Sequence, residues 1–222
     1  MLLAAAATAE GCRQALALGL DVSLSVDPGE FRLQRQGLAT ALSDAQVITA
    51  LTGAPGAQVD LAVFEWSGAY DQRILIEWTT VTDQDTVARI AADLVERPQL
   101  GRTGRTAIGS AMTFGKELLL QRAHCDVLTL DISGDGMNNN GTEPGPVRKS
   151  LAAAGIQVNA LLIASPDNTA LGSNALTLYY ENHVIVGPNA FTETIFGFDD
   201  YADGMRRKLL RELTRAFTWH LD

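Results

Sequence analysis

The chain has 222 residues, of which 46% are apolar and 19% are charged, a composition that excludes a disordered or fibrous protein and allows a sizeable buried core. Its net charge of −9 argues against binding to nucleic acid, because nucleic-acid phosphates require a basic surface. The same acidity suits a site that collects cations, although most acidic surfaces are simply solvated. The apolar run at the N-terminus is far shorter than the ~20 residues that cross a bilayer, so we expect no transmembrane segment.

The first nine residues, MLLAAAATA, have the character of the end of a secretory signal peptide. They finish in Ala7-Thr8-Ala9, a small-x-small pattern typical of a cleavage site. No basic residue precedes them, and the alternative is that they lead directly into a buried strand. We interpret residues 1–9 as the remnant of a signal peptide and residues 11–222 as a single domain, which predicts a periplasmic or secreted protein.

The start of this domain has the pattern of a buried strand followed by a helix. Residues 15–25 form a continuous apolar run, which is typical of a strand covered on both faces. Asp27, Pro28 and Glu30 match an N-cap, a first-turn proline and the acidic partner of a capping box. They predict a helix that ends near Ser43.

An antiparallel hairpin and two helices are predicted next. Residues 59–66 and 74–81 have strand character and are joined by a short turn. A helix capped by its first residue is expected over 82–97, followed by a loop over 98–105 that is rich in Gly and Arg. Residues 106–122 carry an apolar stripe at helical spacing.

The second half of the chain continues the alternation of strands and helices. Strands are expected over 126–133 and 156–164, with a helix over 146–154 between them that a glycine ends. A last short strand over 184–186 and a helix over 201–217 complete the chain. This order predicts an α/β fold with three layers: a doubly wound, mostly parallel sheet with one antiparallel edge strand and helices on both faces.

Oxygen-bearing side chains occupy alternate positions at the end of the first predicted strand, namely Asp21, Ser23 and Ser25. At the carboxyl end of a strand they can point into the crevice where open α/β sheets bind ligands. Carboxylates and hydroxyls are the hard oxygen donors that Mg²⁺ and Ca²⁺ prefer. The alternative is a polar turn that caps the next helix.

Two later segments carry the same kinds of side chain. Thr106 follows the Gly-rich loop and precedes Gly109, and its alternative role is that of an ordinary N-cap. Thr103 is a second candidate, but Thr106 has the better spacing to Gly109. Asp135 lies between two glycines after a buried strand, where the alternative is a plain Asp-Gly turn.

Three motifs follow one another along the chain: Asp-x-Ser-x-Ser, Thr-Ala-Ile-Gly, and Asp-Gly after an apolar strand. Their order resembles that of the metal-ion-dependent adhesion site of the von Willebrand factor type A family. The resemblance covers essentially the whole chain after residue 11, and short exported bacterial members of unknown function are the most similar. It implies a cation site for Mg²⁺, or alternatively Ca²⁺ or Mn²⁺. The implied ligands, direct or through water, are Asp21, Ser23, Ser25, Thr106 and Asp135.

The resemblance implies a protein-binding module of the adhesion or scaffold kind that is not an enzyme. An acidic residue of an unknown partner protein would complete the coordination of the cation. The alternative is a Mg²⁺-dependent phosphohydrolase of the haloacid dehalogenase type, with Asp21 as nucleophile. That enzyme needs a general acid where this chain has Ser23, and a bracing lysine for which Lys149 is the only suitable candidate, so we consider it less favoured.

The two cysteines precede the two aspartates by similar distances. Cys12 lies nine positions before Asp21, and Cys125 lies ten before Asp135. If the two strands are parallel neighbours, the cysteines lie side by side at the opposite edge, within reach of a disulfide. A disulfide requires an oxidising compartment and agrees with export. The alternative is two unrelated buried thiols.

Three further polar features have structural interpretations. Asp131 lies within a predicted strand, and we expect it to be a buried carboxylate that needs a donor partner. Residues 138–140 are three asparagines that we interpret as a solvated turn, and the alternative is that they rim the binding face. The last helix carries a basic stretch that we expect to face solvent, formed by Arg206, Arg207, Lys208, Arg211 and Arg215.

Overall fold

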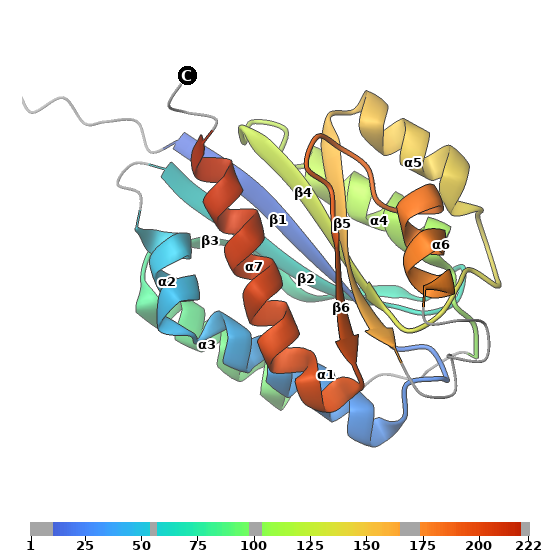
Figure 1. Cartoon of the computed structure of the whole chain (residues 1–222). Helices are drawn as coiled ribbons and strands as arrows, with labels where there is room; N and C mark the ends of the chain where they lie inside the picture. Colours follow the sequence, from blue (N-terminus) through green and yellow to red (C-terminus); the bar gives the residue numbers. More distant parts are fainter. Residues whose placement is uncertain (1–10, 54–56, 98–103, 165–173, 219–222) are drawn as a thin grey trace, which may run out of the picture.

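A six-stranded sheet forms the middle layer of the fold (Figure 1). The computed structural model describes residues 11–53, 57–97, 104–164 and 174–218. The strands lie in the order β3-β2-β1-β4-β5-β6, and every neighbouring pair is parallel except β2 with β3. Their bounds are β1 (Gly11–Asp21), β2 (Ala57–Trp66), β3 (Gln72–Val81), β4 (Val127–Gly134), β5 (Ile156–Ala164) and β6 (Thr192–Phe196).

Helices cover both faces of this sheet (Figure 1). One face is covered by α1 (Pro28–Leu42), α2 (Ala45–Thr52), α3 (Gln84–Glu96) and α7 (Tyr201–Thr218), which the short helix η2 (Phe198–Asp200) precedes. The other is covered by α4 (Ile108–Leu120), α5 (Pro144–Ala153) and α6 (Ala175–His183). The predicted three-layer, doubly wound fold with one antiparallel edge strand is confirmed.

The central strand β1 shows why its sequence is apolar throughout. Leu16, Leu18 and Leu20 pack into the core beneath α1 and α7, whereas Ala15 and Ala17 pack into the core beneath α4. Because successive side chains of a strand point to opposite faces, a strand with helices on both sides needs apolar residues at every position.

Two predicted boundaries, the end of the first strand and the cap of α3, are wrong for local reasons. The first strand ends at Asp21 rather than at residue 25, because the Asp21 carboxylate accepts a hydrogen bond from the backbone N of Ser23 (2.8 Å) and turns the chain. The cap of α3 is Asp83 rather than Thr82, since Asp83 accepts a hydrogen bond from the backbone N of Thr86 (2.7 Å). The predicted capping box of α1 is confirmed.

The predicted strand at 184–186 is wrong. Val186 forms only an isolated antiparallel bridge with Val158, and the sheet ends instead with β6, which is parallel to β5. Three of the five residues of β6 are half-buried polar residues, so this edge strand lacks a clear apolar pattern. Helices α2 and α6 were likewise not expected from the sequence. Residues 1–10 and 98–103 lie outside the described residues, so the signal peptide remains a prediction.

The expected disulfide joins the first strand to the segment before β4. Cys12 and Cys125 are bonded, with their Cα atoms 4.5 Å apart and a sequence separation of 113. The parallel pairing of β1 with β4 brings the two cysteines together, because the pairing starts two residues further along at Gln14 and Val127. Adjacent strands lie about 4.8 Å apart, which is within the Cα separation that a disulfide allows.

The last helix carries a charge into the core. Lys208 is fully buried, and its Nζ lies 2.5 Å from Oδ2 of Asp131 and 2.7 Å from Oε1 of Glu212. Glu212 also accepts a hydrogen bond from the Nδ2 of Asn159 (2.6 Å). Asp131 therefore has the donor that its burial demands. The interpretation of the whole basic stretch as a solvated face is wrong at Lys208.

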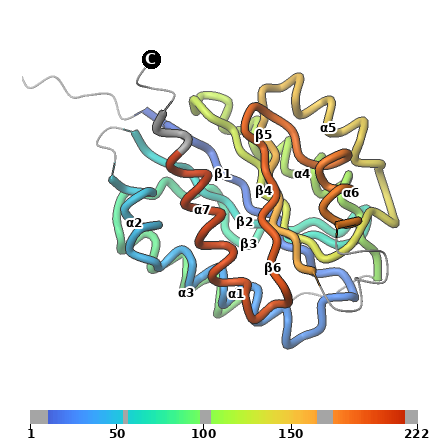
Figure 2. Tube along the Cα trace, in the orientation of Figure 1, coloured from blue at the N-terminus to red at the C-terminus, as the bar shows by residue number. Residues whose placement is uncertain are grey.

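The end of α7 lies beside the start of β1 (Figure 2). The guanidinium of Arg13 donates hydrogen bonds to the backbone O of Ala50 (2.8 Å) and of Leu213 (3.4 Å), which ties β1 to α2 and α7. This end of the sheet is therefore closed by the disulfide and by Arg13, while the carboxyl ends of the strands remain at the opposite edge.

Replacing both cysteines with alanine is expected to lower the free energy of unfolding by about 4–5 kcal/mol, because the bond closes a loop of more than a hundred residues in the unfolded chain. Urea unfolding monitored by circular dichroism measures the difference. Wild-type protein reduced in the presence of a chelator is the control and should match the double variant. Equal stability of the oxidised wild type and the double variant would contradict this account.

Lys208→Met is expected to destabilise the protein by about 3–5 kcal/mol, since it leaves the buried carboxylates of Asp131 and Glu212 without their cation. Lys149→Met, on the exposed side of α5, is the matched control and should change stability little. Thermal and urea unfolding of both variants test this. A Lys208→Met protein as stable as the control would show that the buried ion cluster does not hold α7 on the sheet.

Candidate metal site

The carboxyl ends of β1 and β4 bring Asp21 and Asp135 to the same edge of the sheet. The two strands are paired up to Leu20 and Ser133, and each aspartate follows within two residues. The chain leaves β1 toward β2 on one side, while β4 lies on the other, so this edge is the switch point where open α/β sheets form ligand crevices. Asp21 is fully buried and Asp135 is 8% exposed.

Gly134 allows this close approach. A Cβ atom at Gly134 would lie 2.5 Å from the hydroxyl of Tyr180 and 3.4 Å from Oδ2 of Asp21. Only a residue without a side chain fits between these groups. Tyr180, which comes from α6, donates a hydrogen bond to the backbone O of Gly136 (3.2 Å) and closes the site from one side.

Hydrogen bonds connect four of the five predicted ligands. The Oγ atoms of Ser23 and Ser25 lie 2.9 Å apart, and the hydroxyl of Ser25 donates to Oδ1 of Asp135 (2.9 Å). Asp21 joins the cluster through the backbone N of Ser23 (2.8 Å). The structure thus brings Asp21, Ser23, Ser25 and Asp135 together.

The fifth predicted ligand, Thr106, is held by the loop that follows Asp135. Its backbone N donates to Oδ1 of Asn139 (2.9 Å), and the backbone N of Asn139 donates to the backbone O of Thr106 (2.9 Å). Thr106 is not the N-cap of α4, which begins at Ile108 after Ala107. The side chain of Thr106 is buried beside this loop.

The other two asparagines of residues 138–140 make similar links. Oδ1 of Asn138 accepts a hydrogen bond from the backbone N of Gly109 (3.4 Å), and Oδ1 of Asn140 accepts one from the backbone N of Ala69 (3.0 Å). The interpretation of the three as a solvated turn is therefore incomplete. Their side chains join the loop after β4 to the loop after β2, to the segment before α4 and to the first turn of α4. Sequence reasoning missed this role, and it also missed Tyr180, whose helix α6 was not predicted.

The two carboxyl groups of the cluster are electrostatically unfavourable in the absence of a cation. Burial, and then the charge of Asp135, raise the pKa of Asp21 to about 8 against the opposing hydrogen bonds from Ser23 and from the backbone of Asp135. Burial also raises the pKa of Asp135. Among the described residues, Oδ2 of Asp21 is buried without a hydrogen-bond partner. Buried oxygen atoms of this kind suit a hard divalent cation, which would neutralise both carboxylates.

A family model described as protein of unknown function (DUF1194) matches residues 11–217. No curated protein matches the chain. Within the described residues, no helix has both the length and the apolar character to span a membrane.

Solved structures share the fold at low sequence identity. Proximal thread matrix protein 1 from the mussel byssus is 16% identical with a TM-score of 0.64, over 92% of this chain and 48% of that one. A further structure of it, with a zinc-occupied MIDAS motif, is 15% identical over the same shares, also at a TM-score of 0.64. A von Willebrand factor type A protein from Catenulispora acidiphila is 14% identical with a TM-score of 0.61, over 91% of this chain and 43% of that one.

The pilus adhesin SpaC from Lactobacillus rhamnosus GG is 14% identical with a TM-score of 0.63, over 93% of this chain and 30% of that one. The chain thus spans about half or less of the length of these proteins. The similarity shows that this chain has the fold of von Willebrand factor type A domains, as the sequence motifs indicate.

Asp21 is expected to make the metal-free protein less stable as the pH rises. Its pKa of about 8 in the folded protein lies above its ordinary value of 3.8, so folding takes up a proton between these values. The free energy of unfolding should therefore fall by on the order of 2 kcal/mol between about pH 5 and about pH 7 in chelator.

Urea unfolding across this pH range measures the effect. The Asp21→Asn variant removes the titrating group and should show a flatter profile. Parallel profiles of the wild type and Asp21→Asn would show that the buried Asp21 does not carry the raised pKa.

Proposed function

Because the chain belongs to the family described as protein of unknown function (DUF1194) and has the von Willebrand factor type A fold, we propose that it is a divalent-cation-dependent protein-binding module. The observation that carries this proposal is the cluster of two buried carboxyl groups and two serine hydroxyls at the switch point of the sheet. The fold alone would not support it, because one fold hosts many functions.

In the proposed site, two carboxylates and three hydroxyls offer oxygen atoms to one cation, directly or through water. Mg²⁺ fits because it prefers six oxygen ligands and usually keeps some water, and Ca²⁺ or Mn²⁺ are the alternatives. The two carboxylates balance the charge of the ion, and the hydroxyls add none. A cation held in this way remains able to attract a further carboxylate. The proposed ligands are Asp21, Ser23, Ser25, Thr106 and Asp135.

The proposed partner is a protein that presents an acidic residue to the cation. Leu24 lies between the two serines of the cluster and is 59% exposed, which offers an apolar contact beside the ion. Apolar contact around a central polar anchor is the usual arrangement of a protein interface. The neighbours described as a byssal matrix protein and a pilus adhesin are in keeping with this role.

Export of the protein is part of the proposal. The Cys12–Cys125 disulfide favours an oxidising compartment, because cytosolic thiols are kept reduced. We propose a periplasmic or secreted location, to which the expected signal peptide would direct the chain.

The phosphohydrolase alternative has no observation in its favour. The position of its general acid is Ser23, whose hydroxyl is engaged with Ser25, and a hydroxyl does not donate a proton readily at neutral pH. Phosphatase activity on simple phosphate esters that Asp21→Asn abolishes would favour the enzyme instead.

Asp21→Ala and Asp135→Ala are each expected to abolish stabilisation of the protein by Mg²⁺. At a hundredfold excess over the dissociation constant, the cation should add about 2.7 kcal/mol to the stability of the wild type by mass action. Thermal unfolding with Mg²⁺ and with chelator measures this. Asp203→Ala, an exposed aspartate of α7, is the matched control and should keep the response. An undiminished Mg²⁺ response in both site variants would remove the assignment of the ligands.

Capture of a partner from a cell-envelope extract should depend on the cation. Wild-type protein is expected to retain the partner with Mg²⁺ and lose it with chelator, whereas Asp135→Ala should fail to retain it under both conditions, because an acidic anchor needs the ion. Mass spectrometry of the retained proteins identifies the partner. A partner bound equally by the wild type and by Asp135→Ala in chelator would contradict cation-dependent binding.

A further inference from the structure

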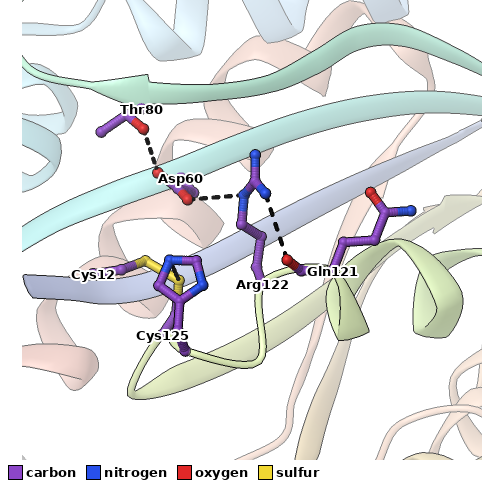
Figure 3. The surroundings of a disulfide bond; sticks show 7 residues. Cys12, Asp60, Thr80, Gln121, Arg122 and Cys125 are labelled. Carbon is purple, nitrogen blue, oxygen red and sulfur yellow. Dashed lines mark hydrogen bonds and ion pairs between the residues drawn. A yellow bond between two sulfur atoms is a disulfide. The ribbon is translucent and has the colours of Figure 1, made fainter.

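The disulfide belongs to a cluster of four potential metal ligands at the end of the sheet opposite the candidate metal site. Figure 3 shows three of them, Cys12, Asp60 and Cys125, around the S–S bond. The ligand atoms of Cys12, Asp60, His124 and Cys125 all lie within 4.8 Å of one another. One ring nitrogen of His124 (Nε2) lies 3.9 Å from Sγ of Cys125. Asp21 lies nine positions after Cys12 along β1, so the two sites are about 30 Å apart.

We propose that these four residues bind a zinc ion when the disulfide is reduced. Two thiolates, one imidazole and one carboxylate are the ligand types that Zn²⁺ prefers, and four ligands make a complete tetrahedral site. Bond lengths of about 2.0–2.3 Å place the ligand atoms of such a site roughly 3.3–3.8 Å apart. Atoms already within 4.8 Å of one another reach that spacing through side-chain rotation, once the two sulfur atoms separate.

The surroundings of Asp60 prepare its carboxylate for this role. The hydroxyl of Thr80 donates to its Oδ1 (2.7 Å), which fixes the orientation of the carboxylate as partners of metal ligands commonly do. Its Oδ2 forms an ion pair with Nε of Arg122 (3.0 Å; Figure 3) and is the oxygen that would turn to the zinc ion.

Arg122 can release Asp60 without leaving the site. Its guanidinium lies over the ring of Trp78 (5.3 Å), and the side chain is 30% exposed. A zinc ion with two thiolates and one carboxylate has a net charge of −1, which a nearby guanidinium would balance. The arginine therefore pairs with the Asp60 carboxylate in the oxidised protein, and in the reduced protein it balances the charge of the whole zinc site.

The zinc site and the disulfide exclude each other, because each uses the same two sulfur atoms. Reduction of the S–S bond takes up two electrons and two protons and yields two thiols. With a phosphine as reductant, the phosphine becomes a phosphine oxide whose oxygen comes from water. Zinc binding then releases the two thiol protons. In the reverse direction a disulfide-bonded oxidant would accept the two electrons of the thiolates by thiol–disulfide exchange, the S–S bond would form, and the zinc ion would leave as Zn²⁺.

Cobalt provides the direct test, because tetrahedral cobalt bound to thiolates absorbs in the visible and gives a thiolate charge-transfer band in the near ultraviolet. Full-length protein is reduced with a phosphine, desalted without oxygen and titrated with Co²⁺ and then Zn²⁺. One equivalent of Co²⁺ should produce both absorptions, and one equivalent of Zn²⁺ should remove them. Oxidised protein should show neither.

Variants distinguish this site from the other one and from nonspecific thiol binding. His124→Ala and Asp60→Asn should each weaken zinc binding at least tenfold, whereas His183→Ala, an exposed histidine of α6, should not. Asp21→Ala should leave the cobalt spectrum unchanged, so this test does not depend on the proposed function.

Three results would overturn the proposal. The first is a reduced wild type that shows no cobalt absorption bands. The second is an equal zinc affinity of the wild type and His124→Ala. The third is a reduced protein with zinc whose circular dichroism spectrum differs from that of the native protein. His124 is exposed, so its replacement does not threaten the fold. The third result counts because a structural zinc ion stabilises the folded state that contains its ligands.

Discussion

The parallel pairing of β1 with β4 is the interaction on which the rest of the structure depends. Its register, with Leu20 opposite Ser133, determines what meets at both ends of the sheet. At the carboxyl ends it places Asp21 near Asp135, and at the amino ends it places Cys12 beside Cys125. A slip of one residue would move every side chain of β1 to the opposite face and separate both pairs.

Two carboxyl groups on these strands are buried, and burial of a charged carboxylate is unfavourable unless a cation lies beside it. The two groups differ in where that cation comes from. Asp131, in the middle of β4, lies against the ammonium group of Lys208, and this pair fastens α7 to the sheet. Asp21, at the end of β1, has no ammonium group against it within the described part of the chain, and burial and then the charge of Asp135 raise its pKa. An internal cation lies against the first group, although burial still raises the pKa of Asp131, whereas the second group is suited to an ion from solution.

The loops around the site are held by amide side chains rather than by secondary structure. Asn138 accepts a hydrogen bond from the first turn of α4, and Asn139 and Asn140 accept one each from the backbone of another loop, so the segments that carry Thr106 and Asp135 form one unit. Such hydrogen bonds hold the candidate ligands in place without apolar packing between the loops. They give a physical reason why three consecutive asparagines follow the ligand loop.

The sequence by itself determined the fold class, the order of most elements, the disulfide partners and four ligand candidates that lie together in the structure. These follow from local chemistry, because continuous apolar runs specify strands buried on both faces and the polar residues after them must lie at the carboxyl edge. The Asp27 capping box and the hairpin of β2 and β3 are equally local.

Only the tertiary structure decided the features that depend on distant partners. The edge strand β6 has too few apolar residues to show a period, and its place is set by β5. Lys208 looks solvated in sequence and is buried because Asp131 and Glu212 receive it. The proximity of Asp60 and His124 to the cysteines arises from the sheet and its turns, because neither residue belongs to a motif or spacing that the sequence analysis could use.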